Sequence, residues 1–390
     1  MLKLIETELK RLTESRTLRE LHVRTAQTPG KITIKGKKLT DFTNWDFLNL
    51  NHESKFIKAF QKEAEETGVG SMAARASSGT LPTHFSLEKS LAGFLSTESA
   101  LLFSSSNQVI LSLVSSLLGE GDCVIVDERL HGRVLDAAVL VHAETLHFDT
   151  SNPDSLARAI KLSQPYKKKL IFCESINPFN GDVLDLKSVI ELTNQENIPF
   201  IIDESYSLGI LGIRGAGILD GANIPLNLLC RFASLSYGLG SYGAFLAGSR
   251  SITEYLLNRS RTFTTECSLP PALAAATETG INIVELAAGK RERLNVLSNH
   301  IRSLLKLSGF NLETESNTPI ILIPFNKRSI AKEIADGLFQ KGYFVEVVNP
   351  GQLLESGAAI RIILNSAHKE KDLDELFVTF TDLNKRVNKS

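Results

Sequence analysis

Short apolar runs alternate with amphipathic stretches through the middle of the chain. Three of the runs end in an acidic residue: Cys123–Asp127, Lys169–Glu174 and Phe200–Asp203. Each is a continuous run rich in β-branched and other apolar side chains, which is typical of a strand buried on both faces of a parallel sheet. Stretches such as 185–195 lie between the runs and predict helices. This alternation predicts an α/β layered domain with a mostly parallel sheet.

The acidic residues that close these strands form the first candidate site. Asp127, Glu174 and Asp203 each stand at the carboxyl end of a predicted strand. Ligands of open parallel sheets bind beyond the carboxyl ends of the strands. We therefore expect the three carboxyl groups to converge at one edge of the sheet.

The two ends of the chain carry other patterns. Residues 1–28 have apolar side chains at helical spacing and predict a helix that Thr28-Pro29-Gly30 ends. Residues 32–50 predict a short strand and loop, and 56–66 a second helix. Helices return from 271 to about 307. Beyond them a smaller α+β unit is expected, with strands at 319–324, 343–348 and 360–364 and helices at 329–341 and 371–383.

These patterns divide the chain into three parts. We expect an N-terminal helix and linker (1–45), a large α/β domain (46–285) and a small C-terminal α+β domain (286–390).

Composition restricts the function classes. The chain has 390 residues, 43% of them hydrophobic and 22% charged, with a formal net charge of −1. This balance gives no long-range attraction to nucleic acid or to an anionic membrane. The four cysteines are far apart without a CxxC pair, so we expect neither a metal site nor disulfides, and a reducing, cytoplasmic setting. The N-terminus lacks a signal-peptide pattern, and no apolar run approaches the ~18 residues of a membrane span.

A series of motifs carries a family resemblance. In chain order they are Gly70–Arg75 with Gly79 and His84–Glu88; Ala100–Ser105; Asp122–Asp127 with His131; Glu174 with Asn180-Gly-Asp182; Asp203–Tyr206 with Gly209, Gly212, Gly215 and Gly217; Leu269-Pro-Pro271; and Ile360-Arg361 with Ala367-His368. In this order and spacing they resemble the α-oxoamine synthases. That family of pyridoxal-phosphate (PLP) enzymes condenses an amino acid with an acyl-CoA, and includes 8-amino-7-oxononanoate synthase and serine palmitoyltransferase. The resemblance covers about 46–368. It implies PLP-dependent transferase fold type I, with a large mostly parallel-sheet domain and a small C-terminal α+β domain.

The resemblance also implies roles for single residues. Asp203 matches the carboxylate that keeps the pyridine nitrogen of PLP protonated, which the chemistry of that cofactor requires. His131 matches the histidine that stacks on the ring, and Glu174 belongs to a cofactor-binding segment. Arg361 matches the arginine that holds the carboxylate of the amino-acid substrate. Without the resemblance, Asp203 reads as a helix N-cap or loop residue, and Arg361 as a surface arginine on a strand.

The expected phosphate loop departs from the family. Ser106 and Asn107 stand where the family has glycine and an aromatic residue, although their polar groups at the start of a helix suit an anion. An ordinary serine-rich N-cap is the alternative. Ser234 is expected to touch the cofactor, and Tyr206 replaces the histidine that hydrogen-bonds its phenolic oxygen.

The largest departure is at the Schiff-base lysine. The family pattern Thr-x-Ser-Lys followed by glycines is matched by Ser234-Leu-Ser-Tyr237-Gly, so Tyr237 takes the position of the lysine. A phenol cannot form an imine with an aldehyde, and its ordinary pKa of ~10 makes it a poor base near neutral pH. No lysine occurs from 188 through 289. A lysine from elsewhere in the fold or from a partner chain stays open.

Three hypotheses follow. The chain is a lysine-less homologue with lost or altered catalysis, including the non-catalytic subunit of a heterodimer. Alternatively it is an active PLP-dependent acyl-CoA:amino acid C-acyltransferase such as 8-amino-7-oxononanoate synthase, with acyl-CoA and an amino acid as substrates. The third hypothesis is a binding or scaffold protein on the same fold. We expect a homodimer, or a heterodimer with a lysine-bearing homologue, with segment 262–271 facing the partner. We also expect a tyrosine hydroxyl, or a water held by one, within hydrogen-bond reach of Asp203 or His131.

Overall fold

The computed structural model describes residues 1–14, 18, 21–127, 132–150, 152–312, 314–348 and 357–387. Its largest element is a seven-stranded sheet in the order β4-β10-β9-β8-β7-β5-β6. The bounds of these strands are Ser99–Phe103 (β4), Ala244–Gly248 (β10), Leu228–Ser234 (β9), Phe200–Asp203 (β8), Lys169–Glu174 (β7), Cys123–Asp127 (β5) and Glu144–Phe148 (β6). β10 runs antiparallel to both neighbours, and the other pairings are parallel.

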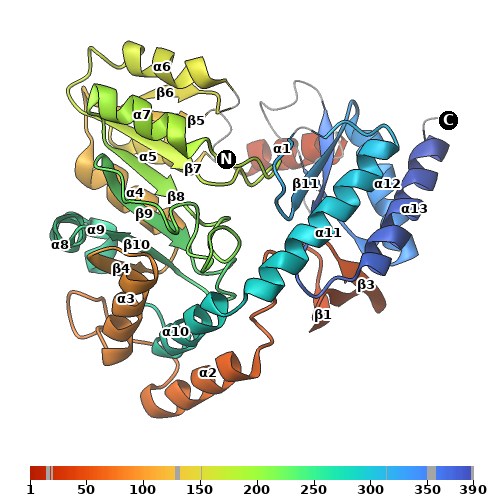
Figure 1. Ribbon diagram of the computed structural model, residues 1–390, viewed down its shortest axis with the longest axis horizontal. Helices are drawn as coiled ribbons and strands as arrows, with labels where there is room; N and C mark the ends of the chain where they lie inside the picture. Colours follow the sequence, from red (N-terminus) through yellow and green to blue (C-terminus); the bar gives the residue numbers. More distant parts are fainter. Residues whose placement is uncertain are drawn as a thin grey trace.

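Helices cover both faces of this sheet (Figure 1). They are α3 (Pro82–Phe94), α4 (Ser106–Leu117), α5 (Arg133–Leu140), α6 (Pro153–Leu162), α7 (Leu186–Glu196), α8 (Arg250–Arg259) and α9 (Arg261–Thr265). Alternate residues of one strand pack on opposite faces. Val124 and Val126 join a core with α4 and α5, whereas Cys123 and Ile125 join a core with α6 and α7. This alternation explains why the sequence of β5 is apolar throughout.

A long helix leads to the C-terminal part of the chain. After α2 (Ser54–Thr67) and α10 (Pro271–Glu285), α11 (Ala288–Leu307) runs from the large sheet towards the smaller one (Figure 1). The smaller sheet has the order β11-β14-β13 and is antiparallel, with bounds Ile320–Phe325, Ala358–Ile363 and Glu346–Val348. Helices α12 (Arg328–Lys341) and α13 (Glu370–Val387) accompany it. The architecture predicted from the sequence, a large mostly parallel sheet followed by a small α+β unit, is confirmed.

The prediction of a single strand at 343–348 is wrong, because the structure has two separate strands there. Tyr343–Phe344 forms β12, which pairs in parallel with β3 (Lys37–Asp41), whereas Glu346–Val348 forms β13 and pairs with β14. The chain changes sheets at the buried Val345. The strand β3 continues an antiparallel meander with β1 (Arg24–Thr28) and β2 (Lys31–Ile34). The division at 45 and 285 stays a prediction.

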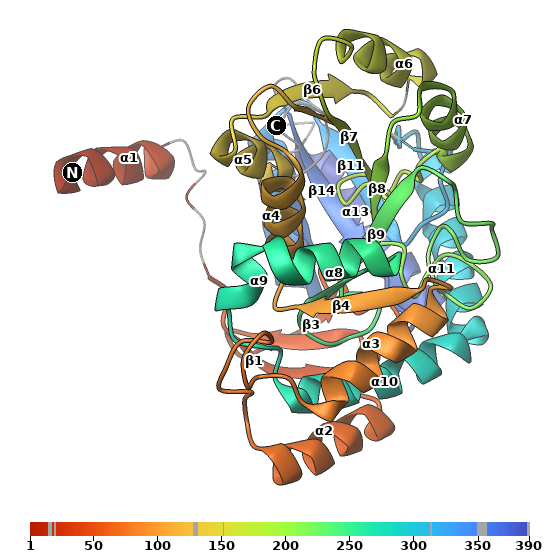
Figure 2. The ribbon, with the colours of Figure 1, turned by 90° about the vertical axis from the view of Figure 1, so that its left-hand side faces the viewer.

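The helix expected over 1–28 is also wrong in its extent. Helix α1 covers Leu2–Glu14, and Arg24–Thr28 is a strand. The turn at Pro29-Gly30, with a φ of +69° at Gly30, folds β1 back on β2, so the strand takes its hydrogen bonds from a neighbour that local spacing does not show. In Figure 2, α1 extends away from the rest of the molecule. None of the helices in the described ranges is long and apolar enough to cross a membrane.

Candidate functional site

The carboxyl ends of three neighbouring strands form the edge at which the site lies. Glu174 and Asp203 are direct partners in the pairing of β7 with β8, and Asp127 closes β5 on the other side of β7. Their side chains are 5%, 4% and 4% exposed. The expected convergence of these carboxyl groups is confirmed, because parallel strands in register bring their ends to one place.

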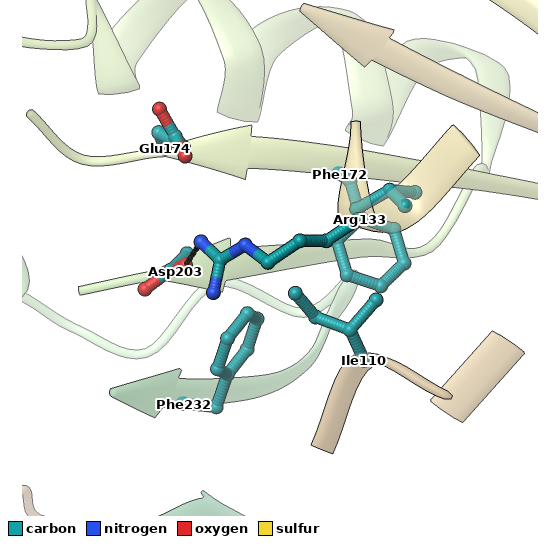
Figure 3. A pocket seen from close by; sticks show the side chains of 7 residues that line it. Ile110, Arg133, Phe172, Glu174, Asp203 and Phe232 are labelled. Carbon is teal, nitrogen blue, oxygen red and sulfur yellow. Dashed lines mark ion pairs between the residues drawn. The ribbon is translucent and has the colours of Figure 1, made fainter. Parts of the chain in front are cut away.

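Asp203 is held by a backbone amide and by an arginine. Its Oδ1 accepts a hydrogen bond of 2.8 Å from the backbone N–H of Ser205. Its Oδ2 lies 3.7 Å from a terminal guanidinium nitrogen of Arg133, the first residue of α5. Burial raises the pKa of Asp203, while Arg133 and Ser205 act in the opposite direction. The ion pair is drawn in Figure 3.

The same guanidinium also reaches the start of α4. A terminal nitrogen of Arg133 donates to Ser106 Oγ at 2.9 Å and to Asn107 Oδ1 at 3.3 Å. Around the arginine lie Phe172, Phe232 and Ile110 (Figure 3), packed so closely that no water-sized space remains. Arg133 therefore connects the acidic strand edge to the expected phosphate loop. Its only signal in the sequence is an isolated basic residue two positions after His131, which does not by itself predict this contact.

Glu174 is buried beside this ion pair. Among the described residues, neither of its carboxyl oxygens has a hydrogen-bond partner. Burial and the nearby Asp203 and Asp127 raise its pKa well above the ordinary value, and Arg133 opposes this only in part. These causes favour the neutral form of Glu174 beside the pair of Asp203 and Arg133.

The raised pKa of Glu174 makes a testable prediction about stability. Because the pKa of Glu174 is higher in the folded than in the unfolded chain, its contribution is fully present below the ordinary value of 4.5. It is lost as the pH rises towards the folded pKa, by up to about 1.4 kcal/mol per pH unit. Glu174→Gln keeps the shape of the neutral acid and should flatten this decline at pH values above 4.5. Denaturant unfolding of both proteins across that range measures it, and parallel curves would contradict it.

The expected phosphate loop has the form of a helix cap in this structure. Ser105 precedes α4 and its Oγ accepts from the backbone N–H of Gln108 at 3.2 Å. Ser106 and Asn107 both accept from Arg133. Ser234, at the end of β9, donates its backbone N–H to Ser205 Oγ. Ser234 thus supports the loop that follows Asp203.

Two tyrosines and a tryptophan form an aromatic cluster beside the acidic edge. The rings of Tyr206 and Tyr237 stack with centroids 4.9 Å apart and an angle of 15° between their planes. Trp45 lies 4.9 Å from the first ring and 5.6 Å from the second. Burial, together with nearby Tyr237 and Glu174, raises the pKa of Tyr206 well above its ordinary value. Both phenols are therefore packed side by side, and Tyr206 is neutral.

The hydrogen bond expected from a tyrosine to Asp203 is not found. Within the described residues the carboxyl group of Asp203 is bonded to Ser205 and paired with Arg133. The arginine takes the position that the phenol was expected to take, because a guanidinium neutralises a buried carboxylate and a phenol does not. The other expected partner, His131, lies outside the described residues.

Arg361 also has internal partners. It lies on β14, and its guanidinium donates to the carbonyl of Pro178 at 2.8 Å and to the carboxylate of Glu346 at 2.6 Å. It stacks over the Trp45 ring at 4.9 Å, so it borders the aromatic cluster. A substrate carboxylate at this arginine must compete with Glu346.

The glycine after Tyr237 fixes the position of the cluster. A Cβ atom at Gly238 would lie 1.9 Å from the carbonyl oxygen of Leu208, a backbone atom that cannot move aside. We expect Gly238→Ala to destabilise the protein by about 1–3 kcal/mol or more, because the loop must shift as a whole. Gly119→Ala is the matched control, since its Cβ would meet nothing within 4 Å. Thermal unfolding compares the two, and equal midpoints would contradict the expectation.

The site residues form two adjoining groups. Ser106, Asn107, Glu174 and Asp203 surround Arg133, and Tyr206, Tyr237 and Arg361 surround Trp45. No motif pointed to Arg133, Trp45 or Glu346. Arg133 and Trp45 contact predicted site residues that are distant in the sequence, and Glu346 contacts Arg361 across the pairing of β13 with β14.

Comparison with known proteins defines the class. Residues 37–380 match the model of the aminotransferase class I and II family, and the chain belongs to this family. Its fold is PLP-dependent transferase fold type I. Within the family the chain is of the α-oxoamine synthase type: it is 28% identical over 391 residues to 8-amino-7-oxononanoate synthase of Saccharophagus degradans, covering 98% of both chains. It is 27% identical over 388 residues to the enzyme of that name from Thermoanaerobacter pseudethanolicus, covering 99% of this chain and 98% of the other.

Solved structures agree with this fold. A serine palmitoyltransferase from S. paucimobilis with a bound PLP–myriocin aldimine superposes with a TM-score of 0.92. Its sequence identity is 23%, and the match covers 99% of this chain and 98% of that one. An 8-amino-7-oxononanoate synthase from Francisella tularensis gives a TM-score of 0.79 at 22% identity, over 90% and 99% of the two chains. PLP is the cofactor that the family resemblance implies, and the PLP-bound neighbours support that implication.

Proposed function

We propose that this chain is an α-oxoamine synthase homologue without a Schiff-base lysine of its own, and that it serves as the non-catalytic partner of a lysine-bearing homologue. The observation that carries the proposal is Tyr237. The resemblance implies that the family lysine stands at this position, and here the side chain stacks on Tyr206 and packs at a tilt against Trp45. A phenol has no amine for a carbonyl group, and its ordinary pKa makes it a poor proton acceptor at neutral pH.

The polar side chains at this site meet only part of what PLP, the cofactor of the family, requires. A buried carboxylate, Asp203, is present, and so are the polar groups of Ser106 and Asn107 at the start of a helix. In the family the pyridine ring lies between such a carboxylate and such a loop. In this structure the guanidinium of Arg133 contacts both, and no water-sized space remains around it. With Arg133 where it lies, the pocket does not fit a pyridoxal ring.

The substrate side supports the same proposal. The family resemblance implies that Arg361 holds the carboxylate of the amino-acid substrate. In this structure its guanidinium already donates a hydrogen bond of 2.6 Å to the carboxylate of Glu346. An internal carboxylate at the site disfavours an external one, because both need the same donor nitrogen atoms. The cofactor carboxylate and the two terminal nitrogen atoms of the substrate arginine thus have partners within the chain.

An active synthase is the second candidate. Similarity to the 8-amino-7-oxononanoate synthases extends over 98% of both chains. In this alternative the chain condenses an amino acid with an acyl-CoA, and a lysine from outside 188–289 or from a partner chain forms the bond to PLP. Noncovalent binding of PLP is compatible with either candidate once Arg133 moves.

Thiol release from acyl-CoA tests the proposal. The purified chain is incubated with PLP, a panel of acyl-CoA thioesters and amino acids, and free thiol is measured. We expect no PLP-dependent release, whereas the 8-amino-7-oxononanoate synthase of S. degradans, assayed in parallel, is the positive control. PLP-dependent release by this chain alone would favour the active synthase and contradict the proposal.

We further propose that the protein is dimeric. Apolar side chains of α1 are exposed: Leu2, Leu4, Ile5 and Leu9 are 75%, 70%, 49% and 48% exposed. Segment 262–271 matches the part of the family site that faces the second subunit. Sedimentation at micromolar concentration should show a dimer, and removal of 2–14 should weaken it. A stable monomer, both alone and after co-expression with a lysine-bearing homologue, would contradict this expectation.

A further inference from the structure

The contact between Arg133 and Asp203 assigns a role to a residue outside the family motifs. We propose that Arg133 is an internal substitute for the cofactor ring: its guanidinium occupies the space between Asp203 and the start of α4 and keeps pyridoxal phosphate out of the pocket. The inference rests on the proposed function, which identifies this pocket with the cofactor site of the family.

The position of the guanidinium is the first argument. One terminal nitrogen lies 3.7 Å from Asp203 Oδ2, and the other donates to Ser106 Oγ at 2.9 Å and Asn107 Oδ1 at 3.3 Å. A single planar group therefore contacts both ends of the space. Figure 3 shows the side chain extending from α5 to Asp203, with Phe232 and Ile110 alongside. A second planar ring cannot enter without displacing the arginine.

Charge balance is the second argument. Asp203 is 4% exposed, and a buried carboxylate without a partner is costly. Arg133 supplies that partner, whereas burial raises the pKa of neighbouring Glu174, which has no hydrogen-bond partner among the described residues. The described part of the site thus contains the pair of Asp203 and Arg133 beside two further buried carboxyl groups, Glu174 and Asp127. A pyridinium placed here would add a second cation next to the guanidinium, which disfavours its protonated form.

Because the side chain of Arg133 is partly exposed, its charged end can move from the pocket into solvent. Its side chain is 25% exposed, whereas that of Asp203 is 4% exposed. The long aliphatic part of an arginine lets the charged group move to water while the stem stays packed. The arginine is therefore the mobile partner of the pair, and its removal should open the ring space without removing the carboxylate.

The test uses pyridoxine 5′-phosphate, which has the ring and phosphate of the cofactor but no aldehyde and so needs no lysine. Its affinity is measured by calorimetry for the full-length chain and for Arg133→Ala. We expect Arg133→Ala to bind at least about 10-fold more tightly. Arg259→Ala, which removes an exposed arginine of α8, is the matched control and should bind as the unaltered chain does.

A second pair of variants keeps the test valid if Arg133→Ala does not fold. The double variant Arg133→Ala/Asp203→Asn leaves no lone buried carboxylate and should bind the probe more tightly than Asp203→Asn alone. Equal or weaker binding after loss of Arg133 in both backgrounds would overturn the inference.

The outcomes also separate this inference from the proposed function. Tight binding by the unaltered chain that Arg133→Ala weakens overturns the inference and leaves the pocket assignment in place. Absence of binding in every folded variant overturns the inference and the pocket assignment together. Pyridoxine 5′-phosphate has no aldehyde and cannot react with a lysine, so the result does not depend on whether the chain lacks the Schiff-base lysine.

Discussion

The double variant Arg133→Ala/Tyr237→Lys is expected to form a borohydride-reducible bond with pyridoxal phosphate, in a one-to-one ratio. Removal of the guanidinium opens the ring space and leaves Asp203 to hold the pyridine nitrogen. Tyr237 is half-buried between Tyr206 and Trp45, so a lysine there is partly desolvated. Desolvation lowers the pKa of a lysine and supplies the neutral amine that an aldehyde needs. Tyr237→Lys alone should react much more weakly, because Arg133 still fills the pocket.

Absorbance near the visible range, followed by reduction and intact mass, measures this reaction. The matched control is Arg133→Ala/Tyr242→Lys, which places a lysine in the same loop at a side chain that is 56% exposed. A folded Tyr237→Lys double variant that reacts no better than this control would show that the pocket lacks more than the lysine and the ring space.

Loss of the buried arginine in the central sheet should have the largest effect on stability. Arg231 of β9 is 1% exposed, pairs with the equally buried Glu204, and donates to the carbonyl of Ala216. We expect Arg231→Ala to destabilise the protein by about 3–5 kcal/mol, because Glu204 is left as a buried charge without its cation. Urea unfolding of the purified variant measures the change.

Two further variants distinguish the charge from the volume of the side chain. Arg231→Met/Glu204→Gln removes both charges and should recover part of the lost stability. Arg250→Ala, at an exposed arginine that opens α8, should stay within about 0.5 kcal/mol of the unaltered chain. If Arg231→Ala lowers the free energy of unfolding by less than about 1 kcal/mol, the ion pair of Arg231 and Glu204 is not a main source of stability in this part of the sheet.

The sequence predicted the elements whose local pattern is unambiguous. Cys123–Asp127, Lys169–Glu174 and Phe200–Asp203 are apolar strands buried on both faces, and the structure confirms all three. Leu228–Ser234 and Ala244–Gly248 were not predicted. The strand Leu228–Ser234 contains Arg231, whose charge is paired with Glu204 at the end of the adjacent strand. The strand Ala244–Gly248 is short and has a glycine at each end. Such strands depend on neighbours that a local pattern does not show.

The site was predictable to the extent that topology determines it. Parallel strands bring Asp127, Glu174 and Asp203 together, so their convergence followed from the pattern. The partners of the charged groups did not follow. Arg133 reaches Asp203 because α5 begins beside the strand ends, and Glu346 reaches Arg361 because β13 pairs with β14. These contacts depend on how separate elements pack.

The most direct test of the proposed loss of the Schiff-base lysine is whether the unaltered protein forms an imine with pyridoxal phosphate. The purified chain is incubated with pyridoxal phosphate, reduced with borohydride, and analysed by intact mass and peptide mapping. The account predicts no stoichiometric adduct on any lysine and no PLP-dependent absorbance from a lysine imine. A one-to-one adduct at a single lysine would contradict it, and would identify the chain as a PLP enzyme that uses a lysine outside the family motif.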